Sequence, residues 1–218
     1  MTKKGFIFDL DGVIVDTAKY HFLAWKKLAN SLDIDFTEEE NEQLKGVSRV
    51  KSLEKILSWG NKTISEDQFK ALMAEKNEDY LNHISKMDED EILPDVPRVL
   101  QLLKMKEQAI SLGSASKNAR AILDRVNLKA SFHAIVDGND VTKAKPDPEV
   151  FLIAAKQLEV KPEDCIVFED SVAGVEAANV ANMISIGIGS TDVLGHAKYV
   201  FKDFTEISDE FITSLIEN

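Results

Sequence analysis

The sequence predicts an α/β protein with a parallel-sheet core and an inserted helical domain, and two observations predict it. First, short apolar runs recur along the chain with helical segments between them, as in strands joined by crossover helices. Second, the interval between the first two candidate strands is far longer than the roughly twelve residues that a crossover needs. Most of that interval has no strand character. We therefore expect a Rossmann-like core with an inserted α-helical cap domain.

Six apolar runs are candidate strands of the sheet. They span residues 6–8, 109–112, 133–136, 165–168, 184–187 and 199–201. Chemically reactive or charged residues follow the first four runs. Because ligands of open α/β sheets bind outside the carboxyl ends of the strands, we expect these residues to converge in one crevice.

The interval after the first strand contains four expected helices. They span residues 19–30, 37–44, 50–59 and 65–83. Thr37 with Glu40 three residues later has the pattern of a capping box, which marks the start of the second helix. Two prolines then mark the return to the core, followed by apolar residues at helical spacing. We expect the cap domain at residues 16–90 and the core domain at residues 1–15 and 91–218.

The composition argues against several classes of protein. Hydrophobic residues make up 44% and charged residues 29% of the 218 residues, which is ordinary for a globular protein. The net charge of -12 argues against nucleic-acid and anionic-membrane partners, which bind clustered cations. No apolar stretch approaches the ~18 residues of a membrane span. With a single cysteine and no signal-peptide pattern, we expect a cytoplasmic protein.

Two aspartates directly follow the first candidate strand. Asp9 and Asp11 are two residues apart, and Gly12 and Asp16 come shortly after them. Such a cluster of carboxylates suits a hard cation, which takes oxygen ligands, and it can also supply a nucleophile. The alternative is that Asp9 only forms the turn that ends the strand.

Four motifs resemble those of the haloacid dehalogenase superfamily of phosphotransferases with a helical cap. In chain order they are residues 9–16, Ser114, Lys145 with Pro146, and residues 169–171. Other segments resemble the sugar phosphomutases of that superfamily, namely Asp16-Thr17, His21, Trp25 and residues 44–49 and 114–118. This resemblance implies a Mg²⁺-dependent, monomeric enzyme that interconverts β-D-glucose 1-phosphate and glucose 6-phosphate. The implied intermediates are a phospho-aspartate enzyme and β-glucose 1,6-bisphosphate.

The resemblance assigns the catalytic and metal-binding roles to carboxylates. Asp9 is the implied nucleophile, since an acyl phosphate divides one difficult displacement into two easier ones. Asp11 is the implied general acid and base, which requires surroundings that raise its pKa. The implied Mg²⁺ ligands are Asp9, Asp11 through its backbone carbonyl, Glu169 and Asp170. Asp170 could instead be the N-cap of a helix that starts near Ser171.

Two residues are implied to hold the phosphoryl group that is transferred. Ser114 is expected at a helix N-terminus, where a hydroxyl and backbone amides favour an anion. The ammonium of Lys145 would offset the charge of the phosphoryl oxygens. The alternative for Lys145 is a solvated loop lysine, which the following Pro146 makes less favourable.

The second phosphate of a bisphosphorylated sugar, here called the distal phosphate, requires its own site. The implied contacts are Lys45, Gly46, Val47, Ser48 and Arg49 in the cap and Ser116, Lys117 and Asn118 in the core. Ser52 and Ala115 are implied as further contacts to the substrate. Arg49 is the expected anchor, because a guanidinium clamps phosphate oxygens in a bidentate geometry. Gly46 lets the backbone approach a ligand closely.

Four further cap residues are implied to face the substrate. Thr17, His21 and Trp25 lie at the start of the first cap helix or on it, and Lys76 lies on the last one. His21 and Trp25 share one helical face, so simple packing is the alternative for both. The alternative for Lys76 is a solvated surface lysine.

Two other functions use the same core motifs. In a sugar-phosphate phosphatase, water rather than a sugar hydroxyl would attack phospho-Asp9. A catalytically silent phosphosugar-binding module would bind without reacting, although both aspartates are present. The identity of the sugar stays open. For a mutase, closure of the cap would exclude water, with hinges expected near residues 15–16 and 93–94.

Overall fold

The computed structural model describes residues 3–217, so the ends of the predicted core domain, residues 1–2 and 218, lie outside the described residues. It contains a six-stranded parallel sheet in the order β3-β2-β1-β4-β5-β6. The strands are β1 (Gly5–Phe8), β2 (Ala109–Gly113), β3 (Ala134–Val136), β4 (Cys165–Glu169), β5 (Ile184–Ile188) and β6 (Tyr199–Phe201). This order is that of a doubly wound Rossmann-type sheet. The predicted fold class and all six predicted strands are confirmed.

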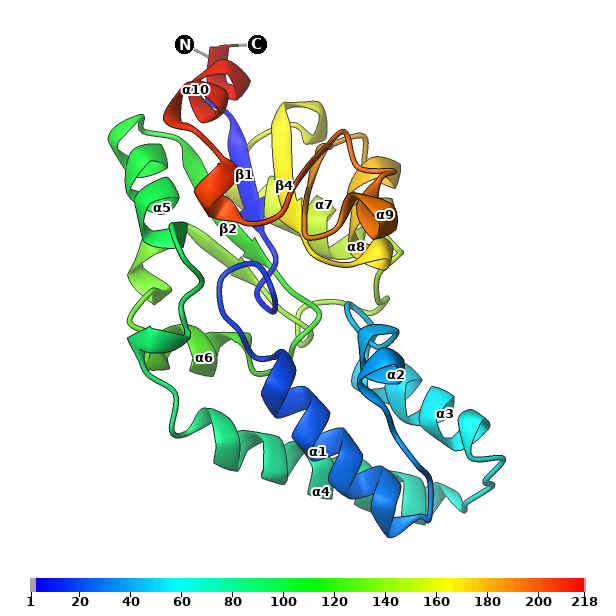
Figure 1. Cartoon of the computed structure of the whole chain (residues 1–218). Coiled ribbons are helices and arrows are strands. Elements are labelled where there is room, and N and C mark those ends of the chain that lie inside the picture. Colours follow the sequence, from blue (N-terminus) through cyan, green and yellow to red (C-terminus); the bar gives the residue numbers. More distant parts are fainter. Residues whose placement is uncertain (1–2, 218) are drawn as a thin grey trace.

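Helices cover both faces of the sheet (Figure 1). Alternate residues of a strand point to opposite faces, so Phe6 and Phe8 pack on one side and Ile7 on the other. The first side is covered by α5 (Val96–Met105), α6 (Ala119–Arg125) and α10 (Asp209–Glu217), and the second by α7 (Glu149–Leu158) and α8 (Val172–Val180). The short α9 (Thr191–Leu194) lies between β5 and β6 in the chain. Because β1 is buried on both faces, it is apolar throughout, as its sequence predicts.

A lobe of four helices lies between β1 and β2 in the chain and stands apart from the sheet (Figure 1). The helices are α1 (Ala18–Ser31), α2 (Glu38–Glu42), α3 (Arg49–Trp59) and α4 (Glu66–Ile84). All four predicted helices are confirmed, and the capping box of Thr37 and Glu40 is present. The second helix ends two residues earlier than expected. The chain then turns toward Gly46, whose φ of +69° is incompatible with a continuing helix.

The cap lobe has an apolar core of its own. Trp25, Leu28, Phe36, Leu53 and Ile56 are among the buried residues of this cluster, which is separate from the clusters on the two faces of the sheet. These side chains come from α1, α3 and the segment before α2. The lobe therefore buries much of its apolar surface internally, while Tyr80 and Ile84 of α4 belong to the cluster on the first face of the sheet.

The chain passes between the lobes at two adjacent segments. The amide of Asp16 donates to the carbonyl of Glu91 at 3.0 Å, and the amide of Leu93 donates to the carbonyl of Ile14 at 3.0 Å. Val15 and Ile92 form an antiparallel bridge between them. These segments coincide with the positions expected for the hinges. None of the helices within residues 3–217 has the length and hydropathy of a membrane span.

Candidate active site

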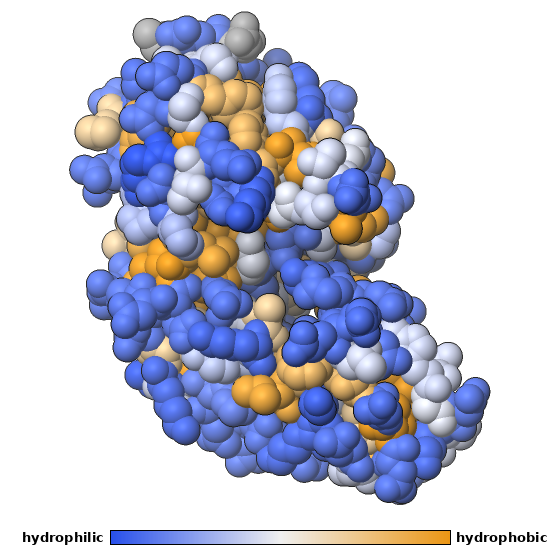
Figure 2. Space-filling model, viewed as in Figure 1, coloured by the Kyte–Doolittle hydropathy of each residue, from blue (hydrophilic) through white to orange (hydrophobic). Residues whose placement is uncertain are grey.

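A cavity of about 610 Å³ lies between the two lobes, at the carboxyl ends of the central strands. Figure 2 shows the indentation where the lobes meet. Its wall contains these predicted site residues: Asp9, Asp11, His21, Trp25, Lys45, Gly46, Val47, Ser48, Arg49, Ser52, Lys76, Ser114, Ala115, Ser116, Lys117, Asn118, Lys145 and Asp170. Thr17 and Glu169 are fully buried and do not line the cavity. The fold thus brings the predicted residues of both lobes to one place.

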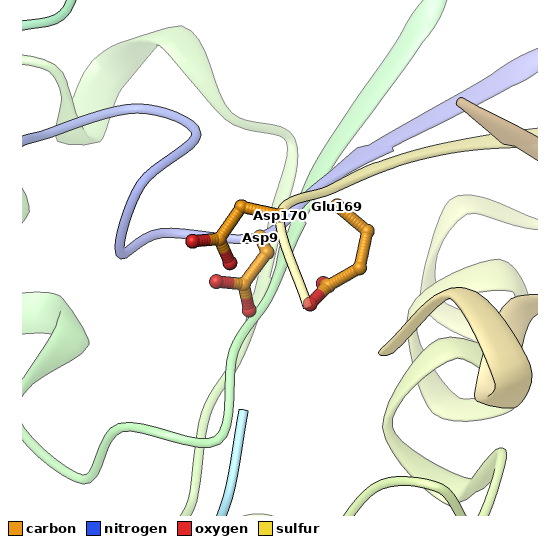
Figure 3. Close-up of side chains that lie close together, drawn as sticks. All are labelled: Asp9, Glu169 and Asp170. Carbon is orange, nitrogen blue, oxygen red and sulfur yellow. The ribbon is translucent and has the colours of Figure 1, made fainter. Parts of the chain in front are cut away.

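Three carboxylates meet at the ends of β1 and β4 (Figure 3). One ligand atom each of Asp9, Glu169 and Asp170 can be chosen so that all lie within 4.8 Å of one another. Burial and the charge of Glu169 raise the pKa of Asp170 well above its usual value. A cation would relieve this repulsion, and an all-oxygen donor set fits Mg²⁺ or Ca²⁺. The residues present therefore fit a hard divalent metal.

The close approach of Asp170 to the turn after β1 depends on glycine. Gly12 has a φ of +76°, and a Cβ atom added there would lie 2.2 Å from the Oδ2 atom of Asp170. Any side chain at this position would displace the carboxylate from the cluster. The glycine of the first motif is therefore required by contact as well as by backbone conformation.

Lys145 supplies the positive charge inside the carboxylate cluster. Its ammonium donates to Asp9 at 2.6 Å and to Glu169 at 2.9 Å. Burial opposes the charge on Lys145, but the two carboxylates hold its pKa above the usual range. Only 1% of its side chain is exposed, so the alternative of a solvated loop lysine is wrong.

Ser171, rather than Asp170, caps the helix that follows β4. The hydroxyl of Ser171 accepts a hydrogen bond from the amide of Gly174 at 3.0 Å and donates to the carboxylate of Glu169. The alternative in which Asp170 is the N-cap is therefore wrong. Because the helix N-cap is Ser171, the carboxylate of Asp170 is not used for capping and stays available at the wall of the cavity.

Asp11 is paired with Thr17, the residue that precedes α1. The hydroxyl of Thr17 donates to the carboxylate of Asp11. Desolvation, and then the charge of Asp9, raise the pKa of Asp11 to about 6, although Thr17 opposes the rise. Such a value suits proton transfer near neutral pH. Thr17 was expected to contact substrate, but the structure places it behind Asp11, which it orients.

Lys76 is enclosed by aromatic side chains of the cap. Its ammonium lies 3.0 Å from the Nδ1 atom of His21 and 4.6 Å from the ring centres of both Trp25 and Tyr80. Burial, and then the charge of Arg49, lower the pKa of Lys76 to about 7. Only 3% of Lys76 is exposed, so the alternative of a solvated lysine is wrong.

Tyr80 is a wall residue that sequence reasoning missed. Its ring lies 4.3 Å from that of His21, centre to centre, and it is 1% exposed. Helical spacing could have found it, because Met73, Lys76 and Tyr80 lie on one face of α4 and all line the cavity. The predicted pairing of His21 with Trp25 therefore belongs to a larger aromatic cage around a lysine.

The cap loop between α2 and α3 approaches the carboxylate cluster of the core. The ammonium of Lys45 lies 3.5 Å from Asp170 and 2.8 Å from Glu42. A Cβ atom added to Gly46 would lie 2.4 Å from the hydroxyl of Ser171, so the loop contacts the core directly. Lys45 is thus placed to balance the carboxylate cluster from the cap side.

Arg49 is the first residue of α3 and faces the cavity. It forms no ion pair with a carboxylate anywhere in the described part of the chain, and desolvation lowers its pKa. The preceding Ser48 caps the helix, accepting a hydrogen bond from the amide of Lys51 at 3.4 Å. An unpaired, partly buried guanidinium at a cavity wall suits an anionic ligand.

The loop after β2 forms the core side of the wall. The amide of Ser116 donates to the buried hydroxyl of Ser114 at 3.1 Å. Ser114 was expected at a helix N-terminus, but α6 begins only at Ala119, so this expectation is wrong. The side chain of Asn118 donates to that of Asn77 at 3.1 Å and links the core to the cap.

These features define a class of protein. A Rossmann-type sheet carries a carboxylate next to a buried ammonium, with two further carboxylates beside it, and a helical lobe covers the cavity that they face. A nucleophile, a cation for phosphoryl oxygens and oxygen ligands for a metal are the parts of a phosphoryl-transfer enzyme. The chain belongs to the haloacid dehalogenase-like hydrolase family, whose model matches residues 3–182.

Relatives of known activity place the chain more narrowly. It is 45% identical over 213 residues to the β-phosphoglucomutase of Bacillus subtilis strain 168, covering 96% of this chain and 93% of the relative. The crystal structure of β-phosphoglucomutase from Clostridium difficile matches with a TM-score of 0.94 at 41% identity, covering 99% of this chain and 98% of that one. A phosphorylated carbohydrates phosphatase of Thermotoga maritima is 32% identical, covering 81% of each chain. The predicted superfamily is confirmed, and so is the similarity to sugar phosphomutases.

Proposed function

We propose that this chain is a phosphomutase that interconverts β-D-glucose 1-phosphate and glucose 6-phosphate. The observation that carries the proposal is that cations lie on two sides of one cavity. Lys145 lies next to Asp9, whereas Arg49 begins α3 in the cap and Lys117 lies on the loop after β2, and all three line the cavity. A mutase must hold two phosphates at once and needs cations for both, whereas a simple phosphatase needs cations for only one phosphate. The similarity to two β-phosphoglucomutases supports the same conclusion.

In the proposed reaction Asp9 carries the phosphoryl group. A carboxylate oxygen of phospho-Asp9 is displaced from phosphorus by the free hydroxyl of the sugar phosphate, which forms the 1,6-bisphosphate. Asp11 accepts the hydroxyl proton in this step. The bisphosphate then reorients, Asp9 attacks its other phosphorus, and Asp11 returns the proton to the leaving sugar oxygen. The raised pKa of Asp11 supports a residue that must both accept and donate this proton.

The cations have separate roles in this proposal. Lys145 balances charge on the oxygens of the phosphoryl group in transfer, since it already contacts Asp9. Arg49 and Lys117 hold the distal phosphate, which stays bound while the other one reacts. Ser114, which is buried after β2 and lines the cavity, would hold the same phosphoryl group as Lys145.

We further propose that the metal is Mg²⁺, held by Asp9, Asp170, Glu169 and the backbone carbonyl of Asp11. When bound, it would offset the charge of the phosphoryl oxygens in transfer. The three clustered carboxylates and the close packing of Gly12 on Asp170 support this assignment. Lys45 would then face the metal site from the cap.

We also propose that residues 16–90 close over the core, residues 1–15 and 91–218, as one domain. The separate apolar cluster of the cap and the adjacent connecting segments support this boundary. The Asn118–Asn77 hydrogen bond and the close approach of Gly46 to Ser171 already join the two lobes in this structure, and opening of the cap would break both. Closure would exclude water, which otherwise competes with the sugar for phospho-Asp9.

A sugar-phosphate phosphatase is the second candidate, because a relative of that activity is 32% identical. The deciding experiment supplies β-glucose 1-phosphate, Mg²⁺ and a catalytic amount of the 1,6-bisphosphate, and it measures glucose 6-phosphate and free phosphate in parallel. A mutase forms mainly glucose 6-phosphate. Free phosphate alone would contradict the proposal, and no product at all would favour the silent binding module. A panel of α- and β-sugar 1-phosphates would define the sugar.

The predicted cytoplasmic location and monomeric state stay predictions. Sedimentation equilibrium of the purified chain measures its oligomeric state. The net charge of -12 bears on the substrate, since an anionic sugar phosphate must enter against the overall field and rely on local cations.

A further inference from the structure

Arg120 joins two loops that form neighbouring parts of the cavity wall. It is the second residue of α6, directly after the loop of residues 114–118, and it does not itself line the cavity. Its guanidinium donates to the carboxylate of Asp140 at 2.9 Å, to the carbonyl of Ile135 at 2.8 Å and to the carboxylate of Asp137. Two carboxylates and one carbonyl thus converge on a single side chain outside the proposed phosphate site.

The two aspartates organise the loop after β3, here residues 137–140. The amide of Asp137 donates to Asp140 at 2.9 Å, so one carboxylate serves both Arg120 and the loop backbone. Asp137 is 1% exposed, and it accepts hydrogen bonds from the amide of Asn139 at 2.8 Å and from its side chain at 3.0 Å. Removal of Arg120 would leave a buried carboxylate without its cation.

This second loop in turn holds the loop of residues 114–118. The side chain of Asn139 donates to the carbonyl of Lys117 at 3.0 Å, and the amide of Gly138 donates to the carbonyl of Ser116 at 3.2 Å. A Cβ atom added to Gly138 would lie 2.4 Å from the carbonyl oxygen of Ala115. The loops are therefore packed backbone against backbone, and a shift of one displaces the other.

We propose that Arg120 is a positioning residue that sets where Lys117 and Asn118 meet the distal phosphate. The proposal rests on the proposed function, in which these two residues contact that phosphate. Arg120 acts through Asp137, Asp140 and the loop that they organise, not through contact with substrate. A planar fork that reaches two carboxylates and a carbonyl is a geometry that lysine cannot reproduce.

The kinetic consequence follows from the role of the distal phosphate. That phosphate stays bound while the other one reacts, so contacts to it stabilise the bound substrate and the transition state alike. A loss of such contacts raises KM and leaves kcat nearly unchanged. We expect Arg120→Ala to raise KM for the sugar phosphate about tenfold, since small displacements of binding groups have effects of this size or larger. Arg120→Lys should lie between Arg120→Ala and the unaltered enzyme.

The matched control is Arg98, a half-exposed arginine in a similar network. It lies 3.1 Å from Asp95, contacts Asp209 and donates to the carbonyl of Ile207 at 2.7 Å, but it does not line the cavity or contact its loops. Arg98→Ala should lower the unfolding midpoint with no change in KM. Thermal unfolding of every variant, measured beside the kinetics, separates a loss of stability from a shift of the loop.

Asp140→Asn tests the same network while Arg120 stays in place beside the buried Asp137. Its effect on KM should be smaller than that of Arg120→Ala, and the double variant should resemble Arg120→Ala alone, because both changes break one connected unit. An unchanged KM in a folded Arg120→Ala variant, an equal rise in Arg98→Ala, or additive effects in the double variant would each overturn the proposal.

The proposed function and this inference fail in different ways. If the unaltered enzyme releases only free phosphate, the mutase assignment is wrong, and the KM of that hydrolysis still measures the effect of Arg120→Ala on binding. If mutase activity is present and KM does not respond to Arg120→Ala, the positioning role alone is wrong.

Discussion

The ammonium of Lys145 lies 2.6 Å from the carboxylate of Asp9, although the two residues are 136 positions apart in the chain. Both side chains are buried, and Lys145 also contacts Glu169 at 2.9 Å. The pair joins the nucleophile that we propose to the cation that we propose for its phosphoryl group. Because the pair is buried, the loss of either partner should lower the free energy of unfolding.

Replacement of Lys145 tests this pair. Lys145→Ala leaves two buried carboxylates without their cation, so we expect a loss of unfolding free energy of about 3–5 kcal/mol as well as a loss of activity. Urea unfolding measures the first. The control is Lys143→Ala, because 68% of the Lys143 side chain is exposed and a change of less than ~0.5 kcal/mol is expected there. Equal stability of the two variants would contradict the role of Lys145 in the cluster.

Asp9→Asn should abolish turnover, since an amide cannot form the acyl phosphate. The side chain keeps its shape, so circular dichroism should show a folded protein. Asp16→Asn, at an exposed aspartate in the same motif, is the control and should retain activity. Incubation with the labelled bisphosphate, followed by denaturation, should leave label on the unaltered enzyme and none on Asp9→Asn. Turnover by Asp9→Asn would mean that the nucleophile is elsewhere.

Lys76 should make stability depend on pH. Burial lowers its pKa from 10.5 to about 7 in the folded state, so between these values the unfolded chain binds more protons than the folded one. Stability therefore rises with pH across this window, and the cost of burying the charge is fully present below pH 7. Lys76→Met should stabilise the fold by a few kcal/mol at pH 6, on the order expected for such a shift, and by little near pH 10.5.

Thermal unfolding of Lys76→Met from pH 6 to pH 10 measures this effect. Lys70→Met is the control on the same helix, because 67% of the Lys70 side chain is exposed. It should show no comparable dependence on pH. A gain in stability that is the same at pH 6 and pH 10 would show that the packing of Met, and not the removed charge, is responsible.

Mg²⁺ should stabilise the folded protein through the carboxylate cluster. A ligand that binds only the folded state at about one hundred times its dissociation constant contributes about 2.7 kcal/mol. Asp170→Asn should lose most of this gain, whereas Asp192→Asn, at an exposed aspartate outside the site, should retain it. Differential scanning calorimetry with and without Mg²⁺ measures the effect independently of activity. An equal gain in both variants would place the metal elsewhere.

Local patterns were sufficient for the elements of the fold. Apolar runs at 6–8 and 165–168 are strands because their residues are buried on both faces of the sheet, and the Thr37 capping box starts a helix because its hydrogen bonds are local. The long interval between two strands indicated the inserted lobe. Each of these features depends on neighbours in the chain, so it can be read from the sequence.

The sequence left open, misassigned or missed the features that depend on contacts between distant parts of the chain. For Lys76 the sequence left a solvated position open as the alternative, and the packing of α1 against α4 instead encloses it between two aromatic rings. Thr17 was assigned to the substrate, whereas its hydroxyl bonds to Asp11 and the residue does not line the cavity. Arg120 was missed because its role depends on Asp137 and Asp140 of another loop, and Tyr80 was missed although the spacing along α4 could have indicated it.

The sequence by itself determined that a parallel sheet with an inserted helical lobe carries Asp9, Asp11, Lys145 and the pair 169–170 at its strand ends. Only the tertiary structure decided which charges meet and how deeply they are buried. The physical reason is how far apart in the chain the interacting residues lie. Strands and caps are specified by local periodicity and hydrogen bonding, but a pKa or an ion pair depends on atoms that only folding brings within a few ångströms.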